Sequence, residues 1–234
     1  MQKNKKNFLT RVRNGMMYVL DLIIGRCMPK VRKYYQTQKA KRLENANPTI
    51  ISNNCTAGII YHDLGLQFRS PTVNLWFSDD DYFEFLDNLD FYVRAVPEET
   101  VVDGINYPVG KVRRGEHEIL IYFMHYDSFD EACKKWTVRG ERMDWKNMYV
   151  IFNHPGFVDK DSNSVKRFLN LKYDHKVMLT NCGKGTSGTE ILHMPVYEKY
   201  SHPGVILEYK SWCSIKRWLD DFDYISFLNQ RSGS

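Results

Sequence analysis

The chain has 234 residues, enough for one sizeable α/β domain or for one domain with an appendage, and its 43% hydrophobic content argues against a disordered protein. The net charge of +5 is unevenly spread, because residues 1–42 hold twelve Lys and Arg but one Asp, so the rest of the chain is net acidic. This distribution argues against nucleic acid as a partner, since a nucleic-acid-binding domain normally carries its basic patch on the domain itself.

Residues 3–42 surround an apolar patch with basic side chains. This composition predicts a basic amphipathic helix that lies on an anionic membrane surface, at the inner face of the cell membrane. The alternative is a helix that docks on the body or on a second subunit. Pro29 is expected to break the helix, and 45–48 reads as a linker. We therefore divide the chain into an arm with its linker, residues 1–47, and a catalytic-type domain, residues 48–234.

The five cysteines are scattered and odd in number, without the CxxC or His/Cys spacing typical of zinc sites. We expect reduced thiols, a cytoplasmic protein and no metal. The apolar run 16–24 is interrupted by Asp21, so it is too short to cross a bilayer and does not resemble a cleavable signal peptide.

Residues 49–61 read as a strand, a tight loop and the start of a helix. Cys55 stands at that junction, where the positive end of a helix dipole can lower a thiol pKa and make thiolate available. The alternative is a small, half-buried residue that packs under the sheet. The polar neighbours Asn53, Asn54 and Thr56 favour the functional interpretation.

The following residues alternate between strand and helix patterns. Gly65 is expected to end the first helix, 72–77 to form a strand, and Ser78 to cap a helix over 79–94. We then expect an edge strand at 107–112, because of Pro108, and a strand at 118–124 buried on both faces. Ser128, with Glu131 three residues later, is expected to cap a helix from 129 to about 139. The remaining expectations are strands at 148–152, 176–180 and 205–209, a turn at 153–156, a mobile loop at 181–188, and helices at 165–171 and 215–228.

The predicted strands alternate with helices and are too apolar to have a solvent-exposed face. This pattern predicts a three-layer α/β/α sandwich with a mixed, mainly parallel sheet. Ligands of such sheets bind beyond the carboxyl ends of the strands. The segments that follow the predicted strands there are 53–55, 125–127, 153–154 and 181–182. Together they offer thiol, imidazole, phenol and amide side chains, enough for a nucleophile, a base and oxyanion donors. We favour His125 over His154 as the base, because His154 lies in a turn-forming His-Pro-Gly; His202 is interpreted as a second such turn.

Several motifs, in this order, resemble a bacterial family found in exopolysaccharide and capsule gene clusters, whose members are often labelled polysaccharide acetyltransferases. The resemblance covers roughly residues 48–230 and rests on Ile51–Cys55, Leu64–Leu66, Ser70–Leu75, Tyr107–Gly110, Phe123–Tyr126, and Ala132 through Trp136 to Arg139 and Arg142. It implies an α/β/α fold and a role in making or decorating a surface glycan.

The resemblance implies that the protein is an O-acyltransferase. It would move an acetyl group, with acetyl-CoA as the donor, to a sugar of a lipid-linked or nucleotide-linked glycan precursor. Cys55 would be the nucleophile or the edge of the donor pocket, and His125 would be the base. The oxyanion would be held by Asn53, Asn54 and backbone N–H groups near Thr56. Asn74 and Tyr126 are further predicted substrate-binding residues. Arg139 and Arg142 could bind a phosphate, although solvated charges near a helix end are the simpler interpretation.

Two other functions stay open. The same edge could bind a nucleotide-sugar, which would make the protein a glycosyl or phosphosugar transferase in which Cys55 is incidental. The absence of a DxD-like loop motif counts against metal-dependent glycosyl transfer, because Asp79–Asp81 is better explained by helix capping. The third alternative is a non-catalytic, membrane-peripheral assembly factor attached through the basic arm.

Overall fold

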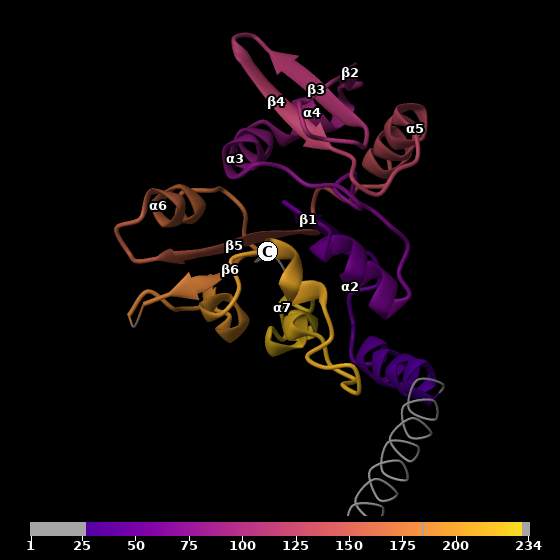
Figure 1. The fold of residues 1–234 in the computed structure, drawn as a ribbon, viewed down its shortest axis with the longest axis vertical. Coiled ribbons are helices and arrows are strands. Elements are labelled where there is room, and N and C mark those ends of the chain that lie inside the picture. Colours follow the sequence, from indigo (N-terminus) through magenta and orange to yellow (C-terminus); the bar gives the residue numbers. More distant parts are fainter. Residues whose placement is uncertain (1–26, 184, 231–234) are drawn as a thin grey trace, which may run out of the picture.

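The computed structural model describes residues 27–183 and 185–230, which contain two β-sheets and the helices that flank them (Figure 1). The larger sheet is parallel, with strand order β1-β5-β6-β7. Its strands are β1 (Thr49–Ser52), β5 (Met148–Val158), β6 (Lys176–Cys182) and β7 (Ile191–His193). The smaller sheet is antiparallel, with the order β2 (Glu98–Thr100), β3 (Val109–Arg114) and β4 (His117–Tyr122). The prediction of an α/β fold with a mainly parallel sheet is confirmed.

Helices cover both faces of the parallel sheet. Residues 27–40 are helical, and Pro29 lies in the first described turn, so this helix continues past the proline. The other helices are α2 (Thr56–Leu64), α3 (Asp79–Asp87), α4 (Leu89–Arg94), α5 (Phe129–Gly140), α6 (Asn163–Leu169) and α7 (Tyr224–Leu228), with short 3-10 turns η1 (Pro195–Glu198), η2 (Pro203–Leu207) and η3 (Trp218–Asp221).

Successive residues of the parallel strands point into two separate hydrophobic cores. In β5, Val150 and Phe152 join the core under α3, α4, α5 and α6, while Tyr149 and Ile151 join the core under α2 and α7. Ile50 and Ile51 in β1 alternate in the same way. A sheet buried on both faces is the middle layer of a three-layer domain, which explains why these strands lack polar alternation.

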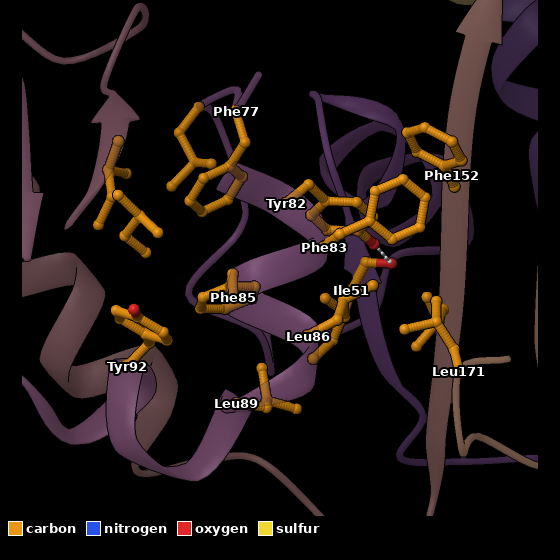
Figure 2. Close-up of a cluster of buried hydrophobic side chains, with 14 of the residues drawn as sticks. Ile51, Phe77, Tyr82, Phe83, Phe85, Leu86, Leu89, Tyr92, Phe152 and Leu171 are labelled. Carbon is orange, nitrogen blue, oxygen red and sulfur yellow. Dashed lines mark hydrogen bonds between the residues drawn. The ribbon is translucent and has the colours of Figure 1, made fainter. Parts of the chain in front are cut away.

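The first core fixes α3 against the sheet (Figure 2). Phe83 packs edge-on against Phe152 with ring centroids 4.9 Å apart. The buried Tyr82 hydroxyl lies 3.1 Å from the Ile51 carbonyl oxygen of β1 and 3.0 Å from that of Ile151 in β5. These contacts hold the first turn of α3 against the neighbouring strands β1 and β5.

The capping signals read from the sequence are confirmed. The Ser78 hydroxyl accepts a hydrogen bond from the Asp81 N–H, and the Ser128 hydroxyl accepts one from the Glu131 N–H. Gly65 ends α2 with a φ of 67°, in the left-handed region that favours glycine. The helix expected over 79–94 is divided at Asn88 into α3 and α4.

Three strand predictions in the first half of the domain are wrong in part. Residues 72–77 form no strand, and Trp76 alone makes a bridge to Tyr122. The apolar run 118–124 does contain a strand, β4, but this strand lies at the edge of the antiparallel sheet, and its buried face is formed by Ile119 and Ile121. The edge strand expected at 107–112 corresponds to β3, which is the central strand between β2 and β4. Pro108 does not prevent this pairing, because it precedes the first residue of β3.

The second half also departs from the prediction. The expected turn at 153–156 is part of β5, which continues to Val158 with a register shift between His154 and Phe157. Residues 203–207 form the 3-10 turn η2 instead of a strand, and the expected closing helix is divided into η3 and α7. Such short elements have little periodicity for a sequence pattern to detect.

Candidate functional site

A cleft of about 650 Å³ opens at the carboxyl ends of β1 and β5, as expected for a parallel sheet. Its walls come from the β1–α2 junction, the segment before α3, the loop after β4, the distal half of β5, and η2 with the residue before it. The lining residues are Asn53, Asn54, Cys55, Trp76, Phe77, Ser78, Asp79, Tyr107, Met124, His125, Asn153, His154, Pro155, Gly156, His202, Pro203, Gly204 and Leu207.

The amides at the strand ends bind one another. Asn53 donates to the Asn153 carbonyl and accepts from the Asn153 N–H, both at 2.9 Å, which joins the ends of β1 and β5. Asn54 Oδ1 accepts from the Thr56 N–H, the Thr56 hydroxyl and Asn153 Nδ2. Within the described residues, Asn54 Nδ2 is buried without a partner, so it would reach a ligand only after the loop moves. This network shapes the cleft floor.

The predicted oxyanion donors near Thr56 are already occupied. The Thr56 N–H binds Asn54 Oδ1 at 3.0 Å, and the Ala57 N–H binds the Ser52 hydroxyl at 3.0 Å. Because side chains of the same loop satisfy the first N–H groups of α2, these groups do not point unpaired into the cleft.

Cys55 lines the cleft at the N-cap position of α2, as predicted, but its chemistry differs from the prediction. The side chain is half-buried, with Sγ 3.9 Å from the Leu75 carbonyl oxygen, and burial raises the pKa of the thiol to about 11. The expected lowering of the thiol pKa is wrong, because burial disfavours the charged thiolate. Near neutral pH, Cys55 is therefore a neutral thiol.

Alkylation rates test this property. Below pH 9, a pKa of about 11 leaves Cys55 with about a hundredfold less thiolate than an ordinary cysteine has, because each pKa unit is a factor of ten. We expect iodoacetamide to modify exposed Cys213 about a hundredfold faster than Cys55 at pH 8, as measured by peptide mass spectrometry. The Cys55 rate should rise with pH up to about pH 11; a rate at pH 8 equal to that of Cys213 would contradict the burial argument.

A histidine and a carboxylate form a pair inside the cleft. His154 Nδ1 lies 2.7 Å from Asp79 Oδ2, which joins β5 to the first turn of α3. The His154 ring packs near Phe152, with centroids 5.7 Å apart, and its side chain is 22% exposed. A carboxylate on Nδ1 holds the proton on that nitrogen and leaves Nε2 free to accept a proton.

His202 has the opposite arrangement. Its Nδ1 accepts a hydrogen bond from the Gly204 N–H at 3.0 Å, so the neutral ring carries its proton on Nε2. His125, the base favoured from the sequence, lies exposed in the loop after β4 and also lines the cleft. The cleft therefore holds two imidazoles with complementary tautomers and a third at its rim.

Aromatic side chains form one wall of the cleft. Trp76 stacks on Tyr122 with ring centroids 3.8 Å apart and an interplanar angle of 10°, and its Nε1–H donates to the Tyr107 hydroxyl at 3.0 Å. Trp76 and Tyr107 line the cleft, whereas Tyr122 supports Trp76 from behind. We call Trp76 and Tyr107 the aromatic ledge.

Comparison with known proteins assigns the chain to a family. Residues 28–229 match the family described as "Domain of unknown function (DUF1919)". The chain belongs to this family. It is also similar to an uncharacterized protein of Haemophilus influenzae, with 34% identity over 190 residues, 81% of this chain and 87% of that protein. All residues of the cleft lie within the DUF1919 match, and the family description names no reaction. The likeness to a glycan gene-cluster family therefore stays a prediction.

Several predicted substrate-binding residues of this DUF1919 domain lie away from the cleft. Arg139 is buried and donates to the Tyr126 hydroxyl at 2.5 Å and to the Val73 carbonyl at 3.2 Å. Arg142 reaches the Phe68 carbonyl at 3.5 Å. Asn74 adopts a positive φ of 67° and stands beside Gly58 of α2. These side chains bind the protein's own backbone or pack on it, and none of them lines the cleft.

The acidic run at the start of α3 has separate partners. Asp79 pairs with His154, Asp80 accepts from Arg167 at 2.7 Å, and Asp81 accepts from the Ser78 hydroxyl at 2.7 Å. Within residues 27–183 and 185–230, no three His, Cys, Asp or Glu side chains are grouped so that they could hold a metal ion. The sequence reasoning assigned Asp79 to helix capping alone and so missed its role in the cleft.

Proposed function

We propose that the protein is an O-acyltransferase that moves an acyl group from a thioester, such as acetyl-CoA, to a hydroxyl of a sugar in a glycan precursor. The observation that carries this proposal is the His154–Asp79 pair inside the cleft. A paired imidazole is the most common general base for activating a hydroxyl. The acceptor class comes from the resemblance of the sequence motifs to the capsule-cluster family.

The reaction needs only a base, a hydrogen-bond donor and the two substrates. His154 Nε2 takes the proton of the sugar hydroxyl as its oxygen attacks the thioester carbonyl carbon. The new C–O bond forms, the C–S bond breaks, and the leaving thiolate takes the proton back from His154. Asp79 keeps the proton on Nδ1 throughout, so that Nε2 is the ring nitrogen that gains and then loses the transferred proton.

His202 supplies the donor in this proposal. Because the Gly204 N–H fixes its Nδ1 as an acceptor, its Nε2–H is available to the carbonyl oxygen of the thioester, where negative charge develops. This replaces the backbone N–H groups of α2, which are already bonded. Cys55 contributes part of the cleft wall instead of a covalent intermediate, because its thiol is neutral at working pH.

The aromatic ledge supports a sugar as the acceptor, because the apolar face of a sugar ring packs well on an indole ring. It also supports a second candidate, a nucleotide-sugar-dependent transferase, because a nucleobase stacks on the same kind of surface. In that reaction the His154–Asp79 pair would deprotonate the acceptor hydroxyl, and the bond broken would be the one between sugar and phosphate.

The two candidates differ in the donor that is consumed. Purified protein is incubated with acetyl-CoA and a panel of UDP-sugars and methyl glycosides, and chromatography with mass spectrometry measures free CoA and acetylated sugar. We expect acetylated sugar and CoA in equal amounts, and Cys55→Ser should keep at least about a third of the wild-type rate because no covalent step uses the thiol.

Three results would contradict the acyltransferase assignment as stated. Release of UDP without consumption of acetyl-CoA would favour the second candidate. A loss of more than about a hundredfold in Cys55→Ser, with an acetylated Cys55 peptide in the wild type, would restore Cys55 as the nucleophile. Absence of any transfer by the wild type across the panel would favour the non-catalytic alternative.

A further inference from the structure

The helix of residues 27–40 has one face docked on the body of the protein. Gln36 donates to Asp63 of α2 at 2.7 Å, and Lys39 pairs with Asp220 of η3. Both side chains are buried, and the Lys39 ammonium also lies 3.6 Å from the centroid of the Tyr224 ring. For the described residues, this confirms the alternative in which the arm docks on the body; residues 1–26 lie outside the described structure.

Arg32 joins this helix to the turn between η2 and η3. Its Nε donates to the Ser214 carbonyl and its Nη2 to the Trp212 carbonyl, both at 2.9 Å, and its guanidinium lies 3.6 Å from the Tyr209 ring centroid. Figure 1 shows the turn beside the helix, at the end of the molecule opposite the antiparallel sheet. The helix and the turn therefore form one surface.

The other face of the helix is exposed, basic and aromatic. Lys30, Lys33 and Tyr34 are exposed on one side of the helix, at spacings of three and four residues. Lys41, in the turn directly after the helix, is exposed seven residues after Tyr34, and its N–H still binds the Thr37 carbonyl, so it continues the same side. Val31 is 44% exposed and Tyr34 is 67% exposed, and Trp212 in the adjoining turn is 59% exposed. We define Lys30, Val31, Lys33, Tyr34, Lys41 and Trp212 as the basic aromatic face.

The charges of this face are available to a partner. Arg32 and Lys39 are used inside the protein, but among the described residues no carboxylate lies within ion-pair distance of Lys30, Lys33 or Lys41. Six more Lys and Arg precede this face in residues 1–26, and the chain beyond residue 42 is net acidic. The positive charge is therefore concentrated in the N-terminal part of the sequence.

We propose that the basic aromatic face lies on an anionic lipid bilayer. Trp and Tyr are enriched at the level of lipid headgroups, and lysines near the surface bind anionic lipid phosphates, each contributing about fivefold in affinity. Lipid is favoured over a protein partner because the exposed aromatic and aliphatic side chains are interspersed with unpaired lysines, as in interfacial helices. Within the described residues, no helix has the length and apolar character needed to span a bilayer.

Vesicle sedimentation with the full chain tests this proposal. We expect binding to phosphatidylcholine vesicles that contain about 30% phosphatidylserine, no binding to pure phosphatidylcholine, and weakening at high salt. The variant Lys30→Glu/Lys33→Glu/Lys41→Glu should bind at least about a hundredfold more weakly, and Trp212→Ala about fivefold more weakly.

The matched control changes the same net charge elsewhere. Lys134→Glu/Lys135→Glu/Lys172→Glu, at exposed positions on α5 and after α6, should keep binding within about threefold. Equal losses of vesicle binding in both triple variants would mean that net charge alone explains the binding, and this would overturn the proposal. Absence of binding by the wild type would overturn it too. A dimer in solution that dissociates in the first variant alone would assign the face to a second copy. Melting temperatures confirm that each variant is folded.

Discussion

Replacement of His154 by Gln is expected to lower the rate of acyl transfer about 100-fold to 10,000-fold, the usual contribution of a general base. Gln keeps the size and polarity of the site but does not accept a proton at neutral pH. Since the base acts on the reacting hydroxyl and not on donor binding, the KM for acetyl-CoA should change less than about threefold. The measurement is steady-state production of CoA and acetylated sugar.

Asp79→Asn tests whether His154 depends on its carboxylate. An amide in place of Asp79 Oδ2 can donate to Nδ1, which moves the imidazole proton to Nε2 and removes the base. We expect a loss of about tenfold to 100-fold or more with little change in melting temperature, because Asp79 is partly exposed.

The chain offers a matched control for this change. His193 Nε2 lies 2.9 Å from Glu198 Oε1, and neither residue lines the cleft. Glu198→Gln makes the same carboxylate-to-amide change beside a histidine, so it should keep activity within about twofold.

Full activity in His154→Gln would remove this residue as the base and leave His125 as the next candidate.

Much of the fold follows from local patterns, and the errors have a common cause. Ser78, Ser128 and Gly65 are recognised because a cap depends on neighbours three or four residues away. The run 118–124 was assigned to the wrong sheet because an apolar stretch does not identify its pairing partners. β4 pairs with β3 and packs against α3, and both contacts depend on the tertiary fold.

The site is predicted less completely than the fold, for the same reason. The cleft at the strand ends, and the presence of Cys55 and His154 in it, follow from the parallel sheet. His125 also lines the cleft, but it comes from the loop after β4, which belongs to the antiparallel sheet. The pairing of Asp79 with His154 spans 75 residues and is hidden by a capping pattern that already accounts for an acidic first turn. Likewise, the pKa of Cys55 depends on burial beside Leu75, which no local pattern reports.

Arg139→Met is expected to destabilise the protein by about 2–4 kcal/mol without weakening the binding of a phosphate-bearing donor. The guanidinium donates to the Tyr126 hydroxyl and the Val73 carbonyl, and it lies 5.0 Å from the Phe68 ring centroid. Met keeps most of the packing volume but makes neither hydrogen bond, so the buried acceptors lose a charged donor. Urea denaturation measures the change in the free energy of unfolding.

Arg142→Met provides the control for this prediction. Arg142 is half-buried and reaches a single carbonyl oxygen, that of Phe68, at 3.5 Å, so its loss should cost less than about 1 kcal/mol. If Arg139 instead bound a donor phosphate, Arg139→Met would leave the unfolding free energy nearly unchanged and raise the dissociation constant of acetyl-CoA about tenfold or more. The two interpretations therefore predict opposite results in two independent measurements. Arg139 is buried and joined to Tyr126 and to Val73, three residues before Trp76 of the aromatic ledge, which favours a positioning role behind the wall of the cleft.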